Sequence, residues 1–107
     1  MNPQTFQVLS EQNRLDIVEL LYKSPRTVNE IAGILKMHQP QTSKHLRVLA
    51  DAGIVVVRPV KNQRYYQLQP QAFKDLDKWL SKFREMWDER FTRLDKLLAK
   101  EVKKNGR

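Results

Sequence analysis

Met37-His-Gln-Pro-Gln-Thr-Ser-Lys-His-Leu-Arg-Val-Leu-Ala-Asp-Ala-Gly53 is the most informative stretch of this chain. Pro40 suits the first turn of a helix, where its missing N–H costs nothing. Gly53 stands where a helix commonly ends in the left-handed conformation. Between them, Leu46 and Leu49 share one face at helical spacing. The stretch therefore predicts a short amphipathic helix that begins near Pro40 and ends before Gly53.

The other face of this helix carries polar and cationic side chains. Amide, hydroxyl and cationic groups are the types that read base edges and hold phosphates in the grooves of DNA. The candidates for such contacts are Gln39, Gln41, Ser43, Lys44, His45 and Arg47. His45 can equally pack at the edge of the core, and Thr42 is expected to be internal. An ordinary surface helix would have the same pattern, so the flanking segments have to decide.

Two helices are expected before this region. Residues 3–9 carry Phe6, Val8 and Leu9, and Ser10 is the expected N-cap of the next helix, residues 11–23. This second helix has a broad apolar stripe, typical of a well-buried helix, formed by Leu15, Ile17, Val18, Leu20, Leu21 and Tyr22.

A further helix leads directly into the central one. Thr27-Val-Asn-Glu30 matches a capping box, in which the Thr and Glu side chains satisfy unpaired backbone N–H groups at the start of a helix. The apolar face of this helix is expected to be Ile31, Ala32, Ile34 and Leu35. Residues 36–39 then form a tight turn. Two helices across such a turn, the second with polar side chains, give the helix-turn-helix pattern over residues 27–53.

After Gly53 the pattern changes from helical to strand-like. Residues 54–58 are rich in β-branched side chains, and residues 64–68 alternate and are aromatic. Together they predict a β-hairpin over residues 54–68 with a long, mobile basic loop at residues 59–63. The residues expected at its tip, within reach of DNA, are Lys61, Asn62, Gln63 and Arg64. A two-strand cap on the core with a solvated loop is the alternative, and the two are compatible.

The last element is a long helix, expected over residues 70–103. Its apolar residues recur at steps of three and four, as in a heptad seam: Phe73, Leu76, Leu80, Phe83, Trp87, Phe91, Leu94 and Leu98. Such a helix is roughly 50 Å long, so part of its seam needs a partner outside its own core. Self-association is the simplest solution, while a tail that folds back or docks another protein is the rival.

The dimer surface expected from these patterns combines the first and last helices. Its candidate residues are Phe6, Leu9, Leu80, Phe83 and Trp87. Packing inside a single subunit is the competing role for Leu76 and Leu80.

The charge of the chain points to a polyanionic partner. Lys and Arg number 20 against 12 Asp and Glu, a formal net charge of +8 over 107 residues. The excess is concentrated, because residues 36–64 hold six basic side chains and a single acidic one. A domain this basic is expected to meet nucleic acid.

Several classes of function lack their required residues. The chain has no cysteine, which excludes disulfides and thiolate metal sites. No Gly-rich phosphate loop and no His–carboxylate cluster supports an enzyme. No apolar run approaches the length of a membrane span, and the N-terminus lacks a signal peptide pattern. The sequence therefore predicts a cytoplasmic protein without a cofactor or a membrane partner.

Three motifs resemble the ArsR (arsenical-resistance repressor) family of small bacterial regulators. Residues 11–17 resemble the family's "DPTRLRI" segment, and residues 39–49 followed by Ala52-Gly-Ile-Val55 resemble its "SQPTVSKHLKVL…AGLV" recognition helix. Residues 64–68 resemble its "R-x-YY-x-L" strand. The resemblance covers roughly residues 5 to 98, and the tail at residues 87–95 is similar to a branch of the family without metal sites.

The resemblance implies a fold and a function. The fold would be mainly α with a small β-hairpin, a winged helix-turn-helix with a long C-terminal dimerisation helix, in one domain over residues 1–107. The function would be that of a homodimeric, autoregulatory repressor bound to an inverted-repeat operator in double-stranded DNA. A protein-interaction module using the last helix, and a small-molecule sensor, are the alternatives. The resemblance does not specify the operator, the regulated genes or an inducer, and both a repressor and an activator fit it.

Departures from the family pattern are also informative. Metal sensors of the family often carry a Cys-x-Cys pair where this chain has Thr27 and Asn29, and others use histidines in the last helix, which has none here. We therefore expect no metal at the usual family sites. In the turn, Lys36 replaces the usual Gly and would be strained by ~1 kcal/mol in a left-handed conformation. His38 replaces the usual Ser and would cap the recognition helix less well.

Overall fold

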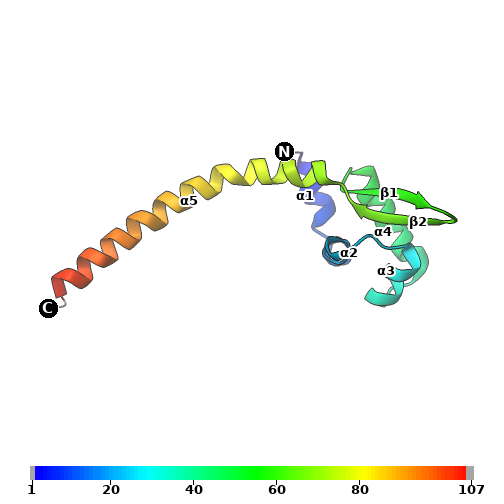
Figure 1. The fold of residues 1–107 in the computed structure, drawn as a ribbon, viewed down its shortest axis with the longest axis horizontal. Helices are drawn as coiled ribbons and strands as arrows, with labels where there is room; N and C mark the ends of the chain where they lie inside the picture. Colours follow the sequence, from blue (N-terminus) through cyan, green and yellow to red (C-terminus); the bar gives the residue numbers. More distant parts are fainter. Residues whose placement is uncertain (1, 106–107) are drawn as a thin grey trace. The chain divides into compact units, whose positions relative to one another are not determined.

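The computed structural model describes the backbone of residues 2–105 and the side chains of residues 2–101. Within residues 2–105, five helices and two strands follow one another (Figure 1): α1 (Pro3–Leu9), α2 (Gln12–Lys23), α3 (Val28–Leu35), α4 (Gln39–Asp51), β1 (Val55–Val60), β2 (Gln63–Leu68) and α5 (Pro70–Asn105). The expected winged helix-turn-helix with a long C-terminal helix is confirmed. The chain divides into two compact units, residues 1–74 and 75–107. The single-domain organisation stays a prediction.

Short polar residues define where the N-terminal helices begin. The Thr27 backbone N–H donates to Glu30 Oε1 at 2.9 Å, and the Glu30 N–H donates to Thr27 Oγ1 at 3.2 Å. The capping box of α3 is therefore confirmed. The expected cap of α2 was wrong by one residue, because Glu11 is the N-cap and Ser10 ends α1. Ser10 has a helical φ of −77° and ψ of −3°, whereas Glu11 is extended, as an N-cap must be.

The turn between α3 and α4 has the conformation that the sequence suggested. Lys36 is left-handed, with φ 56° and ψ 47°, at a position where glycine would carry no strain. His38 is the N-cap of α4 but makes no capping hydrogen bond through its side chain. The buried Thr42 hydroxyl donates to the His38 carbonyl oxygen at 2.9 Å. Both departures from the family pattern therefore have the expected structural consequences.

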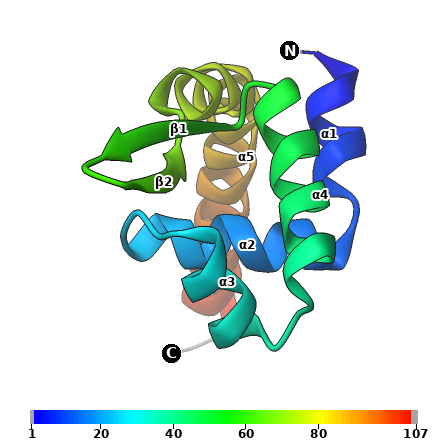
Figure 2. The same cartoon turned by 90° about the vertical axis from the view of Figure 1, so that its right-hand side faces the viewer.

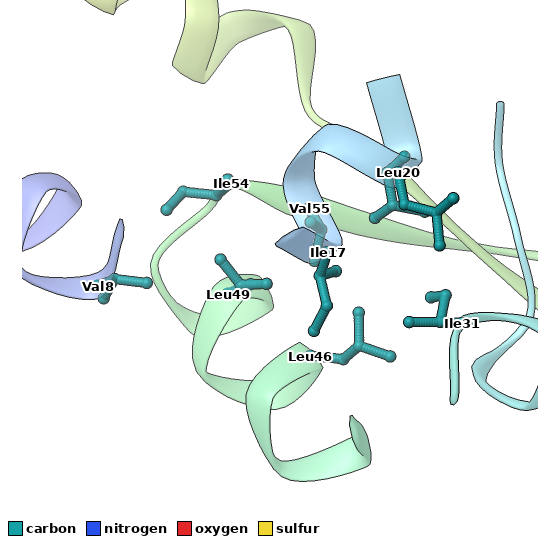
Figure 3. Packing of buried hydrophobic residues seen from close by; sticks show 9 residues of the cluster. Val8, Ile17, Leu20, Ile31, Leu46, Leu49, Ile54 and Val55 are labelled. Carbon is teal, nitrogen blue, oxygen red and sulfur yellow. The ribbon is translucent and has the colours of Figure 1, made fainter. Parts of the chain in front are cut away.

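The hydrophobic core lies in residues 1–74 and draws on α1, α2, α3, α4 and β1 (Figure 3). Its members are Val8, Ile17, Leu20, Leu21, Ile31, Leu46, Leu49, Ile54 and Val55. Leu46 and Leu49 are completely buried, which fixes the inward side of α4. Phe73, at the start of α5, packs against the same cluster. Because each helix contributes one apolar stripe, the core also fixes which side of α4 remains in solvent.

The buried face of α2 is narrower than its apolar composition suggested. Tyr22 is 81% exposed and Leu15 is 38% exposed, against the expectation that both are buried. At ~100° per residue both point away from Ile17, so they cannot reach the core when Ile17 does. Ile34, expected in the buried face of α3, is also exposed.

The hairpin is tighter than expected. Val60 pairs with Gln63 in the register of β1 and β2, so the loop contains only Lys61 and Asn62. The long loop over residues 59–63 was therefore a wrong expectation, because Pro59 and Gln63 extend the strands. Lys61 accommodates the short connection with a φ of 57°, at a position where two-residue hairpins usually place glycine.

A third segment is attached to the hairpin near its base. The Arg26 backbone N–H donates to the Tyr66 carbonyl oxygen at 3.0 Å, and the Tyr66 N–H donates back at 2.8 Å. This isolated antiparallel bridge anchors β2 beside the start of α3. The hairpin is therefore held to the helical body through backbone hydrogen bonds as well as through its apolar side chains.

The long helix α5 begins at Pro70 and contains 36 residues. In the part of α5 that belongs to the second unit, residues 75–107, Trp79 contacts Phe83 and Trp87 contacts Phe91. In the same part, Arg84 forms an ion pair with Asp77. Large apolar side chains are nevertheless exposed along it: Leu80, Phe83, Trp87, Phe91, Leu94, Leu97 and Leu98. None of the helices described is long and apolar enough to cross a membrane.

Candidate nucleic-acid interface

The two sides of α4 differ sharply in what they expose. Thr42, Leu46 and Leu49 are buried against the core. The opposite side is open to solvent. The hairpin is a neighbour of α4 in the fold (Figure 2). The solvent-exposed side of α4 carries most of the predicted DNA contacts, namely Gln39, Gln41, Ser43, Lys44 and Arg47. We call this exposed side of α4 the recognition face.

A hollow of about 610 Å³ lies between α4 and the hairpin. Lys44 and Arg47 line it from α4, and Arg64 lines it from β2. Its remaining lining residues are Pro40, Ser43, Leu46, Ala50, Val57 and Tyr66. Three cationic side chains thus border one concave surface, with no acidic residue among those that line it. An anion such as a DNA phosphate is the chemistry that this arrangement favours.

The register of the hairpin explains why Arg64 faces α4. Residues that alternate along a strand share a face, so Arg64 lies on the side of Tyr66, which packs against the core. Arg64 pairs with Pro59, whereas Arg58 pairs with Tyr65 and belongs to the opposite face. The prediction placed residues 61–64 together at the tip. Only Lys61 and Asn62 are there, because Gln63 and Arg64 belong to β2.

The cations of this surface are not neutralised by the protein itself. In the part of the chain that the structure describes, no ion pair involves Lys44, Arg47, Lys61 or Arg64. Glu30 is the acidic residue nearest in sequence to the turn between α3 and α4. Its carboxylate accepts the Thr27 backbone N–H at the start of α3. Hydrogen bonds from the Thr27 backbone and side chain lower the pKa of Glu30 below its usual value of 4.5. Within the described residues, Lys44 and Arg47 of the recognition face therefore have no ion-pair partner, and Asp51 is the single acidic residue of α4.

His45 differs from the other predicted contacts because it points toward α2. Its Nδ1 accepts a hydrogen bond from Arg14 Nε at 3.3 Å, and its side chain is only 15% exposed. Glu11 Oε2 lies 3.7 Å from the same nitrogen. Of the two roles that the sequence left open for His45, packing at the core edge fits this geometry. A DNA contact by His45 stays a prediction.

Sequence reasoning missed Arg14 as a residue of this region. Arg14 lies one turn into α2, far from α4 along the chain, and only the fold brings it to His45. No spacing rule connects the two positions. The signals available were its basic charge, which many surface residues share, and its match to the first Arg of the "DPTRLRI" segment, which gives no indication of a contact with α4.

The predicted dimer residues are in different settings. Phe6 is exposed on α1, while Leu9 is half-buried and packs against the core. Leu80, Phe83 and Trp87 are exposed on α5. In the described chain, Leu9 therefore has a packing role of its own, and the three α5 residues form part of an apolar series open to solvent.

Comparison with known proteins agrees with this geometry. The model of the family described as "Bacterial regulatory protein, arsR family" matches residues 11–57. The HTH-type transcriptional regulator Rv2034 of Mycobacterium tuberculosis is 38% identical over 78 residues, which are 73% of this chain and 73% of that protein. The chain belongs to the ArsR family.

Solved structures extend the match beyond the helix-turn-helix. A crystal structure of a possible transcriptional regulator for arsenical resistance is 34% identical, with a TM-score of 0.61. The match covers 94% of this chain and 97% of the chain in that structure. A homodimeric winged helix-turn-helix DNA-binding domain, Mb0332 of Mycobacterium bovis, is 27% identical, with a TM-score of 0.61 and coverage of 80% and 77%. The ArsR-family protein described here is a transcriptional regulator with a DNA-binding winged helix-turn-helix, not an enzyme.

Thr27 and Asn29 occupy the positions at which the sequence predicted that no metal is bound, and the absence of a metal site there stays a prediction. Thr27 and Asn29 offer a hydroxyl and an amide where thiolates would be needed, and the Thr27 hydroxyl already accepts the Glu30 N–H. Within the residues that the structure describes, no group of three His, Asp or Glu side chains could hold a metal ion. The donor set at the usual positions does not fit a thiophilic metal.

Proposed function

We propose that this ArsR-family protein is a cytoplasmic, homodimeric repressor that binds an inverted-repeat operator in double-stranded DNA. The observation that carries the proposal is the cationic hollow between α4 and the hairpin, bordered by Lys44, Arg47 and Arg64. A helix entering the major groove brings its exposed side chains to base edges, while neighbouring cations hold the phosphates. Gln39, Gln41 and Ser43 are the proposed base contacts, and Lys61, Asn62 and Gln63 the proposed contacts of the wing.

Self-association is the second part of the proposal. The exposed apolar series of α5 supports it, because a soluble chain does not normally leave so many large apolar side chains in contact with water. The relative Mb0332 is described as homodimeric. Phe6, Leu9, Leu80, Phe83 and Trp87 are the proposed interface residues. A two-fold dimer would present two copies of α4, and the half-sites would be roughly 34–36 Å apart on one face of DNA.

Repression would follow from occupying DNA that polymerase needs, including the promoter of the protein's own gene. An arsenical resistance operon repressor of Bacillus subtilis is 30% identical over 70% of its length. The residues at Thr27 and Asn29 lead us to propose that any signal reaches this protein at a place other than the family's metal sites. Isothermal calorimetry with Zn²⁺ and arsenite tests that part directly.

Selection of bound sequences from random double-stranded DNA is the most informative experiment. The expected product is a palindromic consensus, which then competes in gel-shift titrations against a scrambled duplex of the same length. Specific proteins bind their sites typically 10³–10⁷ times more tightly than other DNA. Enrichment of no sequence would contradict the proposal.

Sedimentation velocity on the same preparation tests the dimer and the main alternative. A dimer at micromolar concentration is the expected result. A monomer that does not prefer any DNA sequence would favour a protein-interaction module that uses α5, and the basic hollow would then be incidental.

A further inference from the structure

A polar cluster joins three helices behind the recognition face. Arg14 Nε donates to His45 Nδ1 at 3.3 Å, and Arg14 Nη1 donates to the Val8 carbonyl oxygen at 3.0 Å. One guanidinium therefore bonds the last turn of α1 and the middle of α4 at the same time. Glu11 Oε2 accepts the Arg14 backbone N–H at 3.3 Å and lies 3.7 Å from His45 Nδ1.

The bond to Val8 satisfies a carbonyl group that has no donor within its own helix. The last carbonyl groups of a helix have no intrahelical donor, and a cation there also complements the helix dipole. Val8 belongs to the last turn of α1, so its carbonyl is such a group. The planar, multi-donor guanidinium can reach two acceptors in different directions, which a lysine ammonium on a flexible stem does less well.

The position of His45 connects this cluster to DNA binding. Lys44 precedes it on the exposed recognition face and Arg47 follows two residues later, whereas His45 is turned inward. A shift or rotation of α4 at His45 therefore moves both proposed phosphate contacts. A displacement of about 1 Å is enough to disrupt a precisely oriented polar contact.

We propose that Arg14 is a positioning residue for DNA recognition, which holds α4 at a fixed angle to α1 through His45 without touching DNA. The inference rests on the proposed function. It adds a route by which α1, a helix of the proposed dimer surface, is linked to the recognition face. The link consists of the hydrogen bonds from Arg14 to His45 and to the Val8 carbonyl.

The test compares R14M with K23M at pH 8 on the selected duplex. Lys23 is an exposed cation on the same helix, so K23M removes the same charge without touching the cluster. R14M should weaken specific binding about tenfold, the effect expected for losing one charge-assisted hydrogen bond. K23M should stay within about twofold. Equal affinity of R14M and K23M would overturn the inference.

His45 variants provide a second measurement, based on rescue by a conservative replacement. Asn places its Oδ1, an acceptor, near the Nδ1 position that accepts from Arg14, whereas Leu has no acceptor. H45N should therefore bind the selected duplex about three- to tenfold more tightly than H45L, the effect of one hydrogen bond. Equal affinities of H45N and H45L would contradict the inference, and both can be measured even if R14M folds poorly.

A double-mutant cycle shows whether Arg14 acts through His45. In the H45L background, which has no acceptor, R14M should cause less than half of the loss that it causes in the wild type. Losses that add fully would overturn the proposed route. A wild type that binds no selected duplex would overturn the proposed function itself, whereas a wild type that binds and an R14M that binds equally well would overturn only the role of Arg14.

Discussion

Arg47 on α4 and Arg64 on β2 line one hollow, although a helix end, a strand and a turn separate them in the chain. Arg64 reaches this surface because the hairpin register puts it on the face of Tyr66, toward the core. Arg58, on the neighbouring strand, has the same charge and belongs to the other face. Arg58 and Arg64 lie on opposite faces of the same hairpin, so their replacements can be compared directly.

Replacing Arg64 by alanine should weaken DNA binding more than replacing Arg58. A phosphate contact that is lost lowers the slope of log K against log salt by about one. We expect this change for R64A and a clearly smaller one for R58A. Gel-shift titrations at several salt concentrations measure both slopes. A slope for R64A equal to that of the wild type would show that Arg64 does not hold a phosphate in the hollow.

Lys44→Ala and Gln41→Ala should differ in the kind of loss. Lys44 lines the hollow, so K44A is expected to weaken binding to all duplexes and lower the salt slope by about one. Gln41 is exposed but uncharged. Q41A should leave the salt slope unchanged and cost about 1–3 kcal/mol of discrimination at one base pair. Titrations against operator variants with single substitutions distinguish these outcomes.

Trp87→Glu should dissociate the proposed dimer. Trp87 is exposed on α5 within an apolar series that we propose to be covered by a second copy. A carboxylate there would lose its hydration on association, which is costly even beside Arg90, whose guanidinium lies 5.3 Å from the centre of the Trp87 ring. Tyr22→Glu is the control, because Tyr22 is an exposed aromatic residue on α2 outside the proposed interface. Sedimentation should give a monomer for W87E and a dimer for Y22E. Two dimers would move the interface away from Trp87.

The stability of α3 should depend on the charge of Glu30. Its pKa is lowered by the hydrogen bonds from Thr27, so the folded state favours the carboxylate. This stabilisation is present above the usual pKa of 4.5 and is lost as the pH falls through the lower, folded pKa. Gln can still accept the Thr27 N–H but does not titrate. The gap in melting temperature between wild type and E30Q should therefore be larger at pH 7 than at pH 3. An unchanged gap would refute the assignment.

Lys36→Gly should stabilise the fold. Lys36 is left-handed at the end of α3, where a side chain costs about 1 kcal/mol and glycine does not. Part of this gain is offset because glycine makes the unfolded chain more flexible, so we expect an increase of up to about 1 kcal/mol in denaturant unfolding. Gly53→Ala, at a φ of 76°, should have the opposite sign. A destabilising K36G would show that the Lys36 side chain contributes more than its strain costs.

Local patterns in the sequence predicted the helices with little ambiguity. The Thr27–Glu30 capping box, Pro40 at the start of α4 and Gly53 at its end are each determined by residues within one turn. The spacing of Leu46 and Leu49 correctly identified the buried side of α4, and with it the recognition face. These features depend on backbone hydrogen bonds and side-chain periodicity, which are local properties.

Apart from the N-cap of α2, which was wrong by one residue, the errors concern which apolar side chains are buried and where the hairpin loop lies. Tyr22 and Ile34 are apolar, yet neither lies on the stripe that its helix buries. The hairpin loop looked long because Pro59 and Gln63 resemble loop residues, but strand pairing includes both. In each case a neighbouring element decided the outcome, and its position is not encoded within the segment.

By itself, the sequence determined that this chain is a basic winged helix-turn-helix of the ArsR family with an apolar last helix. Only the tertiary structure decided that Arg64 faces α4 while Arg58 does not, and that His45 points to Arg14 rather than outward. The reason is that helix formation and capping depend on residues within a few positions of one another. The direction in which a side chain points depends on strand register and on how separate helices pack, and these involve residues far apart in the chain.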